Sequence, residues 1–230
     1  MTPIVLVPGL LCTADVFRPQ ISALWPYGPV TVASTLEGDT IAEMATQILA
    51  SAPPRFALAG ISMGGYICLE IMRLAPERVT KLALINTSAR PDMPEQSKGR
   101  RALVEKARSG DFEALVTTVL TAILHPAHQH DPALRAIHVR MAHTIGNEGL
   151  ARQTEAVIER TDSRPSLRAI SVPTLVLVGD RDPVTPPDHA EELATAIVGS
   201  RLVVVPECGH DSTLEQPDPV NRALVEWLRD

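Results

Sequence analysis

A serine flanked by glycines is the most directly reactive pattern in this sequence. Residues 60–64 read Gly-Ile-Ser-Met-Gly, which fits G-x-S-x-G, and they join the apolar run Phe56–Ile61 to a helix expected from about Met63. The backbone turns sharply at such a junction, and glycine is needed on both sides because Cβ atoms would clash. We therefore expect Ser62 to be a nucleophile at the carboxyl end of a strand, rather than an incidental serine in a glycine-rich turn.

A serine hydroxyl is a weak nucleophile at neutral pH, so it needs a base and a third group that orients the base. Two later loops carry suitable side chains: His210 follows the apolar run Leu202–Val205, and Asp180 and Asp182 follow the run Thr174–Val178. Parallel sheets gather ligand-binding side chains at the carboxyl ends of their strands, where both loops begin. The pattern predicts a Ser–Asp–His triad, but the spacing alone does not choose between the two aspartates.

The loop after the apolar run Ile4–Val7 is a candidate for stabilising negative charge on a substrate oxygen. It contains Gly9, which allows the backbone to turn an N–H, that of Leu10, towards the serine. The N–H of Met63 begins a helix, whose positive dipole end favours an anion at the same point. We expect the N–H groups of Leu10 and Met63 to form an oxyanion hole. An ordinary loop between a strand and a helix would have the same sequence pattern.

The elements that must position these residues alternate along the chain. Short, β-branched apolar runs read as strands buried on both faces, and helices with one apolar stripe lie between them. This alternation predicts an α/β domain with a parallel sheet and right-handed crossovers. The predicted strands are Ile4–Val7, Val30–Ala33, Phe56–Ile61, Leu82–Asn86, Thr174–Val178 and Leu202–Val205.

Residues 90–168 break this alternation, because nothing in them reads as a strand. Apolar stripes over residues 112–123 and 134–145 predict helices instead, separated by breakers such as Pro126 and Gly146. We expect residues 90–168 to be a helical cap inserted into a core formed by residues 1–89 and 169–230. A helical embellishment that only covers apolar surface is the alternative.

Taken together, these motifs resemble the α/β-hydrolase fold family over essentially the whole chain. The resemblance rests on Pro8–Leu11, the elbow at residues 60–64, the inserted helices, the loop at residues 179–183, and Gly209-His210 with Glu215 and Pro217. It implies that Ser62 is the nucleophile, Asp182 the acid and His210 the base, with Leu10 and Met63 as oxyanion donors.

Two departures from the family pattern are visible. The family usually has His-Gly in the oxyanion loop, where this chain has Pro8-Gly9. The chain also begins at what the family counts as its third strand, so we expect a shortened sheet of about six strands, all parallel, with helices on both faces.

A local feature of the sequence, besides the resemblance, also favours Asp182 over Asp180. Thr185 and Pro186 are expected to begin the next helix, as its N-cap and its first residue. That leaves Asp182 in the short free loop before the helix.

Composition limits the other classes of function. The 230 residues are 45% hydrophobic and 21% charged, which is typical of one globular domain. The net charge of −6 argues against nucleic acid as a partner.

The three cysteines, Cys12, Cys68 and Cys208, form no C-x-x-C pair, which argues against a disulfide scaffold and against a cysteine zinc site. This cysteine usage favours a reducing cytoplasm. The N-terminal apolar run has no basic flank and reads as a strand rather than a signal peptide. We expect a small-molecule substrate, and no cofactor, metal ion or membrane partner.

Several other residues have both a functional and a structural interpretation. Gly9 and His138 are expected to contact substrate, although His138 on its apolar stripe is also typical of a partly buried histidine with a hydrogen-bond partner. His125, His128 and His130 do not have a standard zinc spacing, which favours a polar loop over a metal site. A basic run is typical of a solvent-facing helix, but it could attract a carboxylate or phosphate of the substrate: Lys98, Arg100, Arg101, Lys106 and Arg108.

The sequence therefore predicts a serine hydrolase that cleaves a carboxylic ester or thioester through an acyl-enzyme. The same triad could serve a carbon–carbon bond hydrolase or a related lyase, and a small-ligand receptor could retain the pocket without catalysis. A nucleotide-binding protein is disfavoured because neither G-x-G-x-x-G nor a G-K-[S/T] loop occurs. An epoxide hydrolase or dehalogenase is disfavoured because the elbow carries serine rather than aspartate.

Overall fold

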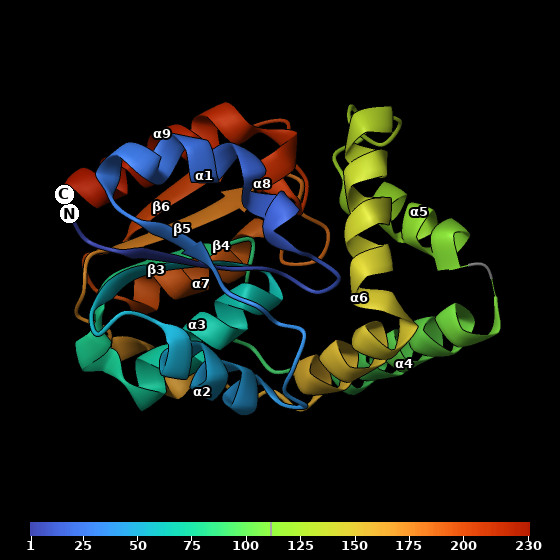
Figure 1. Ribbon diagram of the computed structural model, residues 1–230, viewed down its shortest axis with the longest axis horizontal. Helices are drawn as coiled ribbons and strands as arrows, with labels where there is room; N and C mark the ends of the chain where they lie inside the picture. The colour runs from blue at the N-terminus through green and yellow to red at the C-terminus, as the bar shows by residue number, and fades with distance from the viewer. Residues whose placement is uncertain (111) are drawn as a thin grey trace.

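The computed structural model describes residues 1–110 and 112–230, and its centre is a parallel sheet of six strands in the order β2-β1-β3-β4-β5-β6 (Figure 1). Every neighbouring pair of strands is parallel, which confirms the predicted shortened sheet. The strands are β1 (Ile4–Val7), β2 (Val30–Val32), β3 (Phe56–Ile61), β4 (Val79–Ile85), β5 (Thr174–Gly179) and β6 (Arg201–Val205).

Strand β4 differs most from the prediction. It begins at Val79 rather than Leu82. The prediction missed its first three residues because the polar pair Thr80-Lys81, which is less buried, interrupts the apolar pattern there. It ends at Ile85, since Asn86 has a φ of 43°, in the left-handed region where a strand cannot continue.

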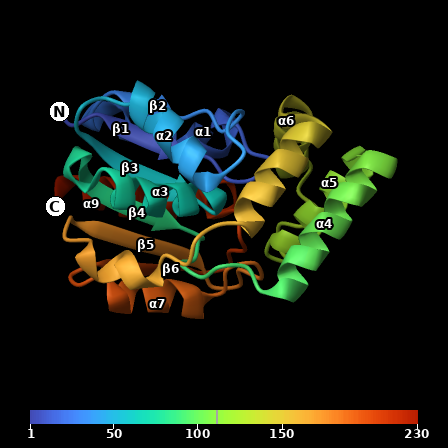
Figure 2. The same ribbon diagram turned by 90° about the horizontal axis from the view of Figure 1, so that it is seen from below.

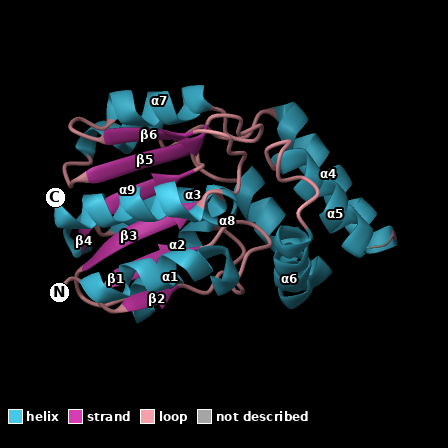
Figure 3. Cartoon of the chain, turned by 90° about the horizontal axis from the view of Figure 1, so that it is seen from above, coloured by secondary structure: helices cyan, strands magenta, loops and turns pink. Residues whose placement is uncertain are grey.

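Helices cover both faces of the sheet because successive strand residues point to opposite sides. Ile4 and Leu6 belong to a core under α1 (Arg18–Leu24) and α9 (Pro217–Arg229), and Val5 and Val7 belong to a second core. Figures 2 and 3 show the two covered faces. The helices over the second core are α2 (Ile41–Ser51), α3 (Met63–Leu74) and α7 (Pro187–Ala196).

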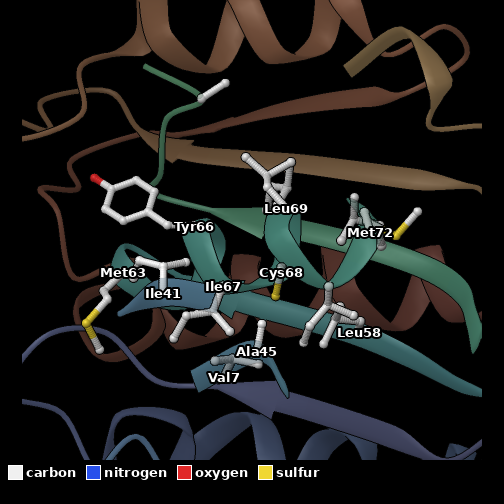
Figure 4. Packing of buried hydrophobic residues seen from close by; sticks show 14 of the residues in the cluster. Val7, Ile41, Ala45, Leu58, Met63, Tyr66, Ile67, Cys68, Leu69 and Met72 are labelled. Carbon is white, nitrogen blue, oxygen red and sulfur yellow. The ribbon is translucent and has the colours of Figure 1, made fainter. Parts of the chain in front are cut away.

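The second core holds α3 firmly beneath the elbow. Ile67 and Cys68 of α3 are fully buried in one cluster with Ala45 of α2 and Val7 of β1 (Figure 4). Met63, the first residue of α3, is also buried in this cluster. The start of α3 is therefore fixed against the sheet.

Three helices lie beyond the carboxyl ends of the strands (Figures 1 and 2). They are α4 (Pro94–Ser109), α5 (Phe112–Ile123) and α6 (Pro132–Ile158), and we call them the helical block. Gly146 has a φ of 72° inside α6, and it divides that helix at a kink. A short helix, α8 (Ser212–Glu215), precedes α9. Within residues 1–110 and 112–230, no helix has both the length and the apolar character that crossing a membrane requires.

Candidate active site

Ser62 occupies a strained turn between β3 and α3. Its φ of 53° and ψ of −116° are rare for a residue with a side chain. A Cβ at Gly60 would collide with the backbone of Gly64, and a Cβ at Gly64 would collide with the backbone of Val7 at the end of β1. The glycines of G-x-S-x-G are therefore required by close packing, as the sequence pattern indicates.

The structure brings Ser62, His210 and Asp182 together in one hydrogen-bonded row. Ser62 Oγ lies 2.9 Å from His210 Nε2, and His210 Nδ1 lies 2.9 and 2.8 Å from the two carboxylate oxygens of Asp182. A carboxylate only accepts hydrogen bonds, so Nδ1 carries the proton and donates it. In the neutral ring Nε2 is then free to accept the hydroxyl proton of Ser62.

Other donors hold the Asp182 carboxylate in place. Asn86 Nδ2 and Thr185 Oγ1 each donate to Oδ2 at 2.8 Å, and the N–H groups of Val184 and Thr185 donate to Oδ1. Burial alone would raise the pKa of this carboxyl, but the charge of His210 and these hydrogen bonds lower it to about 2. Asp182 is therefore ionised throughout the physiological range.

Asp182 in turn changes the basicity of His210. Burial alone would lower the pKa of this imidazole, whereas the charge of Asp182 and its hydrogen bond raise it, and the net pKa lies above the ordinary value of 6.5. Asp211 and Glu215 act in the same direction. The pair stabilises an imidazolium, which is the species formed when His210 takes a proton from serine.

Asp180, the other aspartate of the loop, faces away from this row. Its Oδ1 accepts the backbone N–H of Cys208 at 3.0 Å.

The expectation that Thr185 caps the next helix is wrong. Helix α7 begins at Pro187 with Pro186 as N-cap, because the Thr185 hydroxyl donates to Asp182 instead. Asn86 is a member of the site that the sequence reasoning missed, although its position directly after a buried strand is the signal that led to the others.

The loop after β1 approaches Ser62. Gly9 and Leu10 line the same cavity as Ser62, and Met63 directly follows Ser62 as the first residue of α3. Among the described residues, neither the N–H of Leu10 nor that of Met63 donates a hydrogen bond. The first N–H groups of a helix have no partner within it, so the N–H of Met63 is available to a ligand.

A family model described as "alpha/beta hydrolase fold" matches residues 33–217, a span that includes Ser62, Asp182 and His210. The chain belongs to the alpha/beta hydrolase fold family. Among curated relatives, 3-oxoadipate enol-lactonase 2 of Acinetobacter baylyi is 32% identical over 179 residues. That match covers 76% of this chain and 64% of the relative, just under two thirds of its length.

Solved structures place this alpha/beta hydrolase beside enzymes of the same fold. The enol-lactonase from Burkholderia xenovorans LB400 superposes with a TM-score of 0.89 at 28% identity, covering 100% of this chain and 92% of that one. A thermophilic esterase from Thermogutta terrifontis has a TM-score of 0.86 at 30% identity, covering 100% of this chain and 90% of that one.

In this alpha/beta hydrolase a cavity of about 240 Å³ lies between the strand ends and the helical block. Ser62, His210 and the two residues expected to contact substrate, Gly9 and His138, all line it. Among the described lining residues none is Phe, Tyr or Trp. Most are aliphatic: Leu10, Leu11, Ile61, Leu103, Val116, Val119, Leu120, Ile123, Ala142 and Val184.

Gln153 of α6 holds the loop after β1, and the sequence reasoning missed it. Its side chain is fully buried; Oε1 accepts the N–H of Leu11 at 2.9 Å, and Nε2 donates to the carbonyl of Thr35 at 3.0 Å. Leu11 has a φ of 59°, and this hydrogen bond helps to hold it there. The loop that has Pro8-Gly9 in place of His-Gly is therefore supported from the helical block.

Replacing Gln153 with alanine should lower the free energy of unfolding by about 2 kcal/mol. The substitution leaves the buried carbonyl of Thr35 without its partner, which costs about 1–3 kcal/mol, while the part-buried N–H of Leu11 loses less because water can reach it. Gln47→Ala on the exposed face of α2 is the matched control and should cost less than about 0.5 kcal/mol. Equal urea midpoints for the two variants would contradict the role given to Gln153.

Two other histidines, His138 and His128, have carboxylate partners. His138 Nε2 lies 2.5 Å from Asp211 Oδ2, and His128 Nδ1 lies 3.0 Å from Glu215 Oε2. Asp131 caps α6 by accepting the N–H of Ala133. Within the described part of the chain, no group of three His, Cys, Asp or Glu side chains could hold a metal ion.

Proposed function

We propose that this alpha/beta hydrolase cleaves a small carboxylic ester or thioester through an acyl-enzyme on Ser62. The observation that carries the proposal is the row of hydrogen bonds from Ser62 Oγ through His210 to the ionised Asp182. The relatives support the same class of bond, since an esterase acts on an open ester and a lactonase on a cyclic one.

In the first half of the reaction, Ser62 Oγ forms a bond to the carbonyl carbon while its proton passes to His210 Nε2. The carbonyl oxygen becomes an oxyanion, and the N–H groups of Leu10 and Met63 donate to it. The imidazolium next to Asp182 then gives its proton to the leaving oxygen or sulfur as the bond from that atom to carbon breaks. The acyl group is left on Ser62, and the alcohol or thiol departs.

In the second half, a water molecule takes the place of the leaving group. His210 Nε2 accepts a proton from the water as its oxygen attacks the acyl carbon, and the same two N–H groups stabilise the second oxyanion. The proton returns to Ser62 Oγ as the acyl–serine bond breaks. The products are a carboxylic acid and the regenerated enzyme.

We also propose that the helical block serves as a cap that limits the length of the acyl group. The cavity of about 240 Å³ is smaller than a typical drug-sized pocket, and its aliphatic lining comes largely from α4, α5 and α6. Across p-nitrophenyl esters from acetate to palmitate, kcat/KM should rise about fourfold per methylene, peak at a modest length and then fall.

That series also tests the reaction class. A steady increase towards palmitate, or activation at a lipid–water interface, would contradict the enclosed pocket. Cleavage of none of the esters would contradict the esterase proposal and favour a carbon–carbon bond hydrolase or a receptor.

The raised pKa of His210 predicts the pH dependence of this reaction. Only the neutral imidazole can take the serine proton, so kcat/KM should fall as the pH decreases through an apparent pKa above 6.5. This value belongs to the coupled His210–Asp182 pair. In Asp182→Asn the charge that raises the pKa is gone, and the residual activity should have its acidic limb at lower pH. A wild-type limb below pH 6 would contradict the assignment of His210 as the base.

A further inference from the structure

One arginine lines the cavity beside Ser62. Of the basic run in α4, Lys98, Arg101, Lys106 and Arg108 are exposed, whereas the Arg100 side chain is 26% exposed and contributes to the cavity wall. It is the one Lys or Arg among the described residues that line this cavity. A permanent cation on a mostly aliphatic wall is costly to desolvate, so it calls for an explanation.

The positive charge of Arg100 is only partly neutralised. Its Nε donates to Asp92 Oδ2 at 2.8 Å, and Arg160 Nη1 lies 2.5 Å from the other oxygen of the same carboxylate. The Asp92 side chain is 1% exposed, so one buried carboxylate lies between two guanidinium groups. The three side chains together carry a surplus of one positive charge.

Of the two arginines, Arg160 has more partners within the protein, and Arg100 is the one that lines the cavity. The Arg160 side chain is 7% exposed and donates to the carbonyls of Arg90 and Val157. Its guanidinium lies 4.3 Å from the ring centroid of Tyr66. Among the described residues, the terminal nitrogens of Arg100 have no hydrogen-bond partner. The acid on the cavity wall, Asp211, has its close contact with His138 rather than with Arg100.

We infer that Arg100 binds a carboxylate of the substrate, so that the enzyme prefers a small ester or lactone carrying one free carboxylate. This inference rests on the proposed ester hydrolysis at Ser62. The two terminal nitrogens of the Arg100 guanidinium form one free edge, which can bind a carboxylate with two parallel hydrogen bonds. A single surplus charge matches a monoanion better than a phosphate dianion, and the 240 Å³ cavity restricts the distance between carboxylate and ester.

Two esters that differ only at the end of the acyl chain test the inference. Mono-p-nitrophenyl adipate ends in a carboxylate, and p-nitrophenyl 6-methylheptanoate ends in an isopropyl group of the same shape. The ratio of their kcat/KM values should fall about 10- to 100-fold in Arg100→Gln, the loss expected for a hydrogen bond to a charged group. Arg100→Lys keeps the charge without the paired donors and should give an intermediate ratio.

Arg101→Gln is the matched control. Arg101 is the neighbouring arginine of α4, but its side chain is 55% exposed and paired with Glu155, so the ratio should stay within about twofold of wild type. Arg100→Gln leaves Asp92 paired with Arg160, and its melting temperature should confirm that it folds.

Each alternative result has a separate meaning. An unchanged ratio in Arg100→Gln, with both esters still hydrolysed through Ser62, would overturn the role of Arg100 and leave the proposed function intact. Hydrolysis of neither ester by the wild type would overturn the proposed function, and the carboxylate preference with it. Inorganic phosphate and adipate can also be compared as inhibitors of the hydrolysis of the neutral ester. If phosphate inhibits at a lower concentration than adipate, the choice of a carboxylate would be overturned.

Discussion

Replacing Ser62 with alanine is expected to lower kcat for ester hydrolysis by a factor of 10³ or more. The substitution removes the atom that forms the covalent intermediate, and the residual rate comes only from substrate binding and the oxyanion donors. The nearby thiols of Cys12 and Cys208 cannot replace it easily. Burial raises the pKa of Cys12 and of Cys208, so the two thiols near the cavity stay protonated and weakly nucleophilic.

The same variant should unfold close to the wild-type temperature. The Ser62 hydroxyl contributes one partly buried hydrogen bond, while the elbow is held by the backbone bond from Ser62 N–H to Ile85 and by the packing of Gly60 and Gly64. Substantial activity in a folded Ser62→Ala protein would contradict the proposed mechanism.

Replacing Asp182 with asparagine is expected to lower kcat by about 10⁴ at neutral pH. Backbone N–H groups keep an oxygen at the Oδ1 position, so the amide nitrogen must take the place of Oδ2. There it donates to His210 Nδ1, which moves the ring proton to Nε2 and prevents that atom from accepting the serine proton. It also faces the donor groups of Asn86 and Thr185, which should reduce stability by about 1–3 kcal/mol.

Asp180→Asn is the matched control in the same loop. Its carbonyl oxygen can still accept the N–H of Cys208, so we expect less than a tenfold change in kcat. A larger loss of activity in Asp180→Asn than in Asp182→Asn would reverse the assignment of the acid.

The strands and the elbow were predictable because local pattern and burial agree there. Phe56–Ile61 is apolar at every position and buried at every position, and the glycines on either side of Ser62 mark a turn with no room for side chains. The loop with Asp182 follows β5, which is also buried at every position, whereas the loop with His210 follows the apolar but less buried edge strand β6. Their proximity follows from the topology of a parallel sheet rather than from any contact along the sequence.

The choice of acid and the supporting residues depend on tertiary contacts, which no local pattern encodes. Asp180 and Asp182 share one loop, and only the position of His210 and Asn86 separates them. Gln153 reaches the loop at Leu11 across 142 positions of sequence. A glutamine on a long helix has no feature in the sequence that distinguishes it from a solvent-facing one, and the same holds for Arg100 within its basic run.

The most direct measurement is to label the wild-type protein with a fluorophosphonate and to map the modified residue by mass spectrometry. A serine activated by a neighbouring histidine attacks phosphorus and displaces fluoride, so we expect one stoichiometric adduct on Ser62 and parallel loss of esterase activity. Labelling should be slow below the apparent pKa of His210 and nearly absent in Asp182→Asn. An adduct on any other residue, Cys208 for example, or full activity after complete modification of Ser62, would contradict the central role given to this serine.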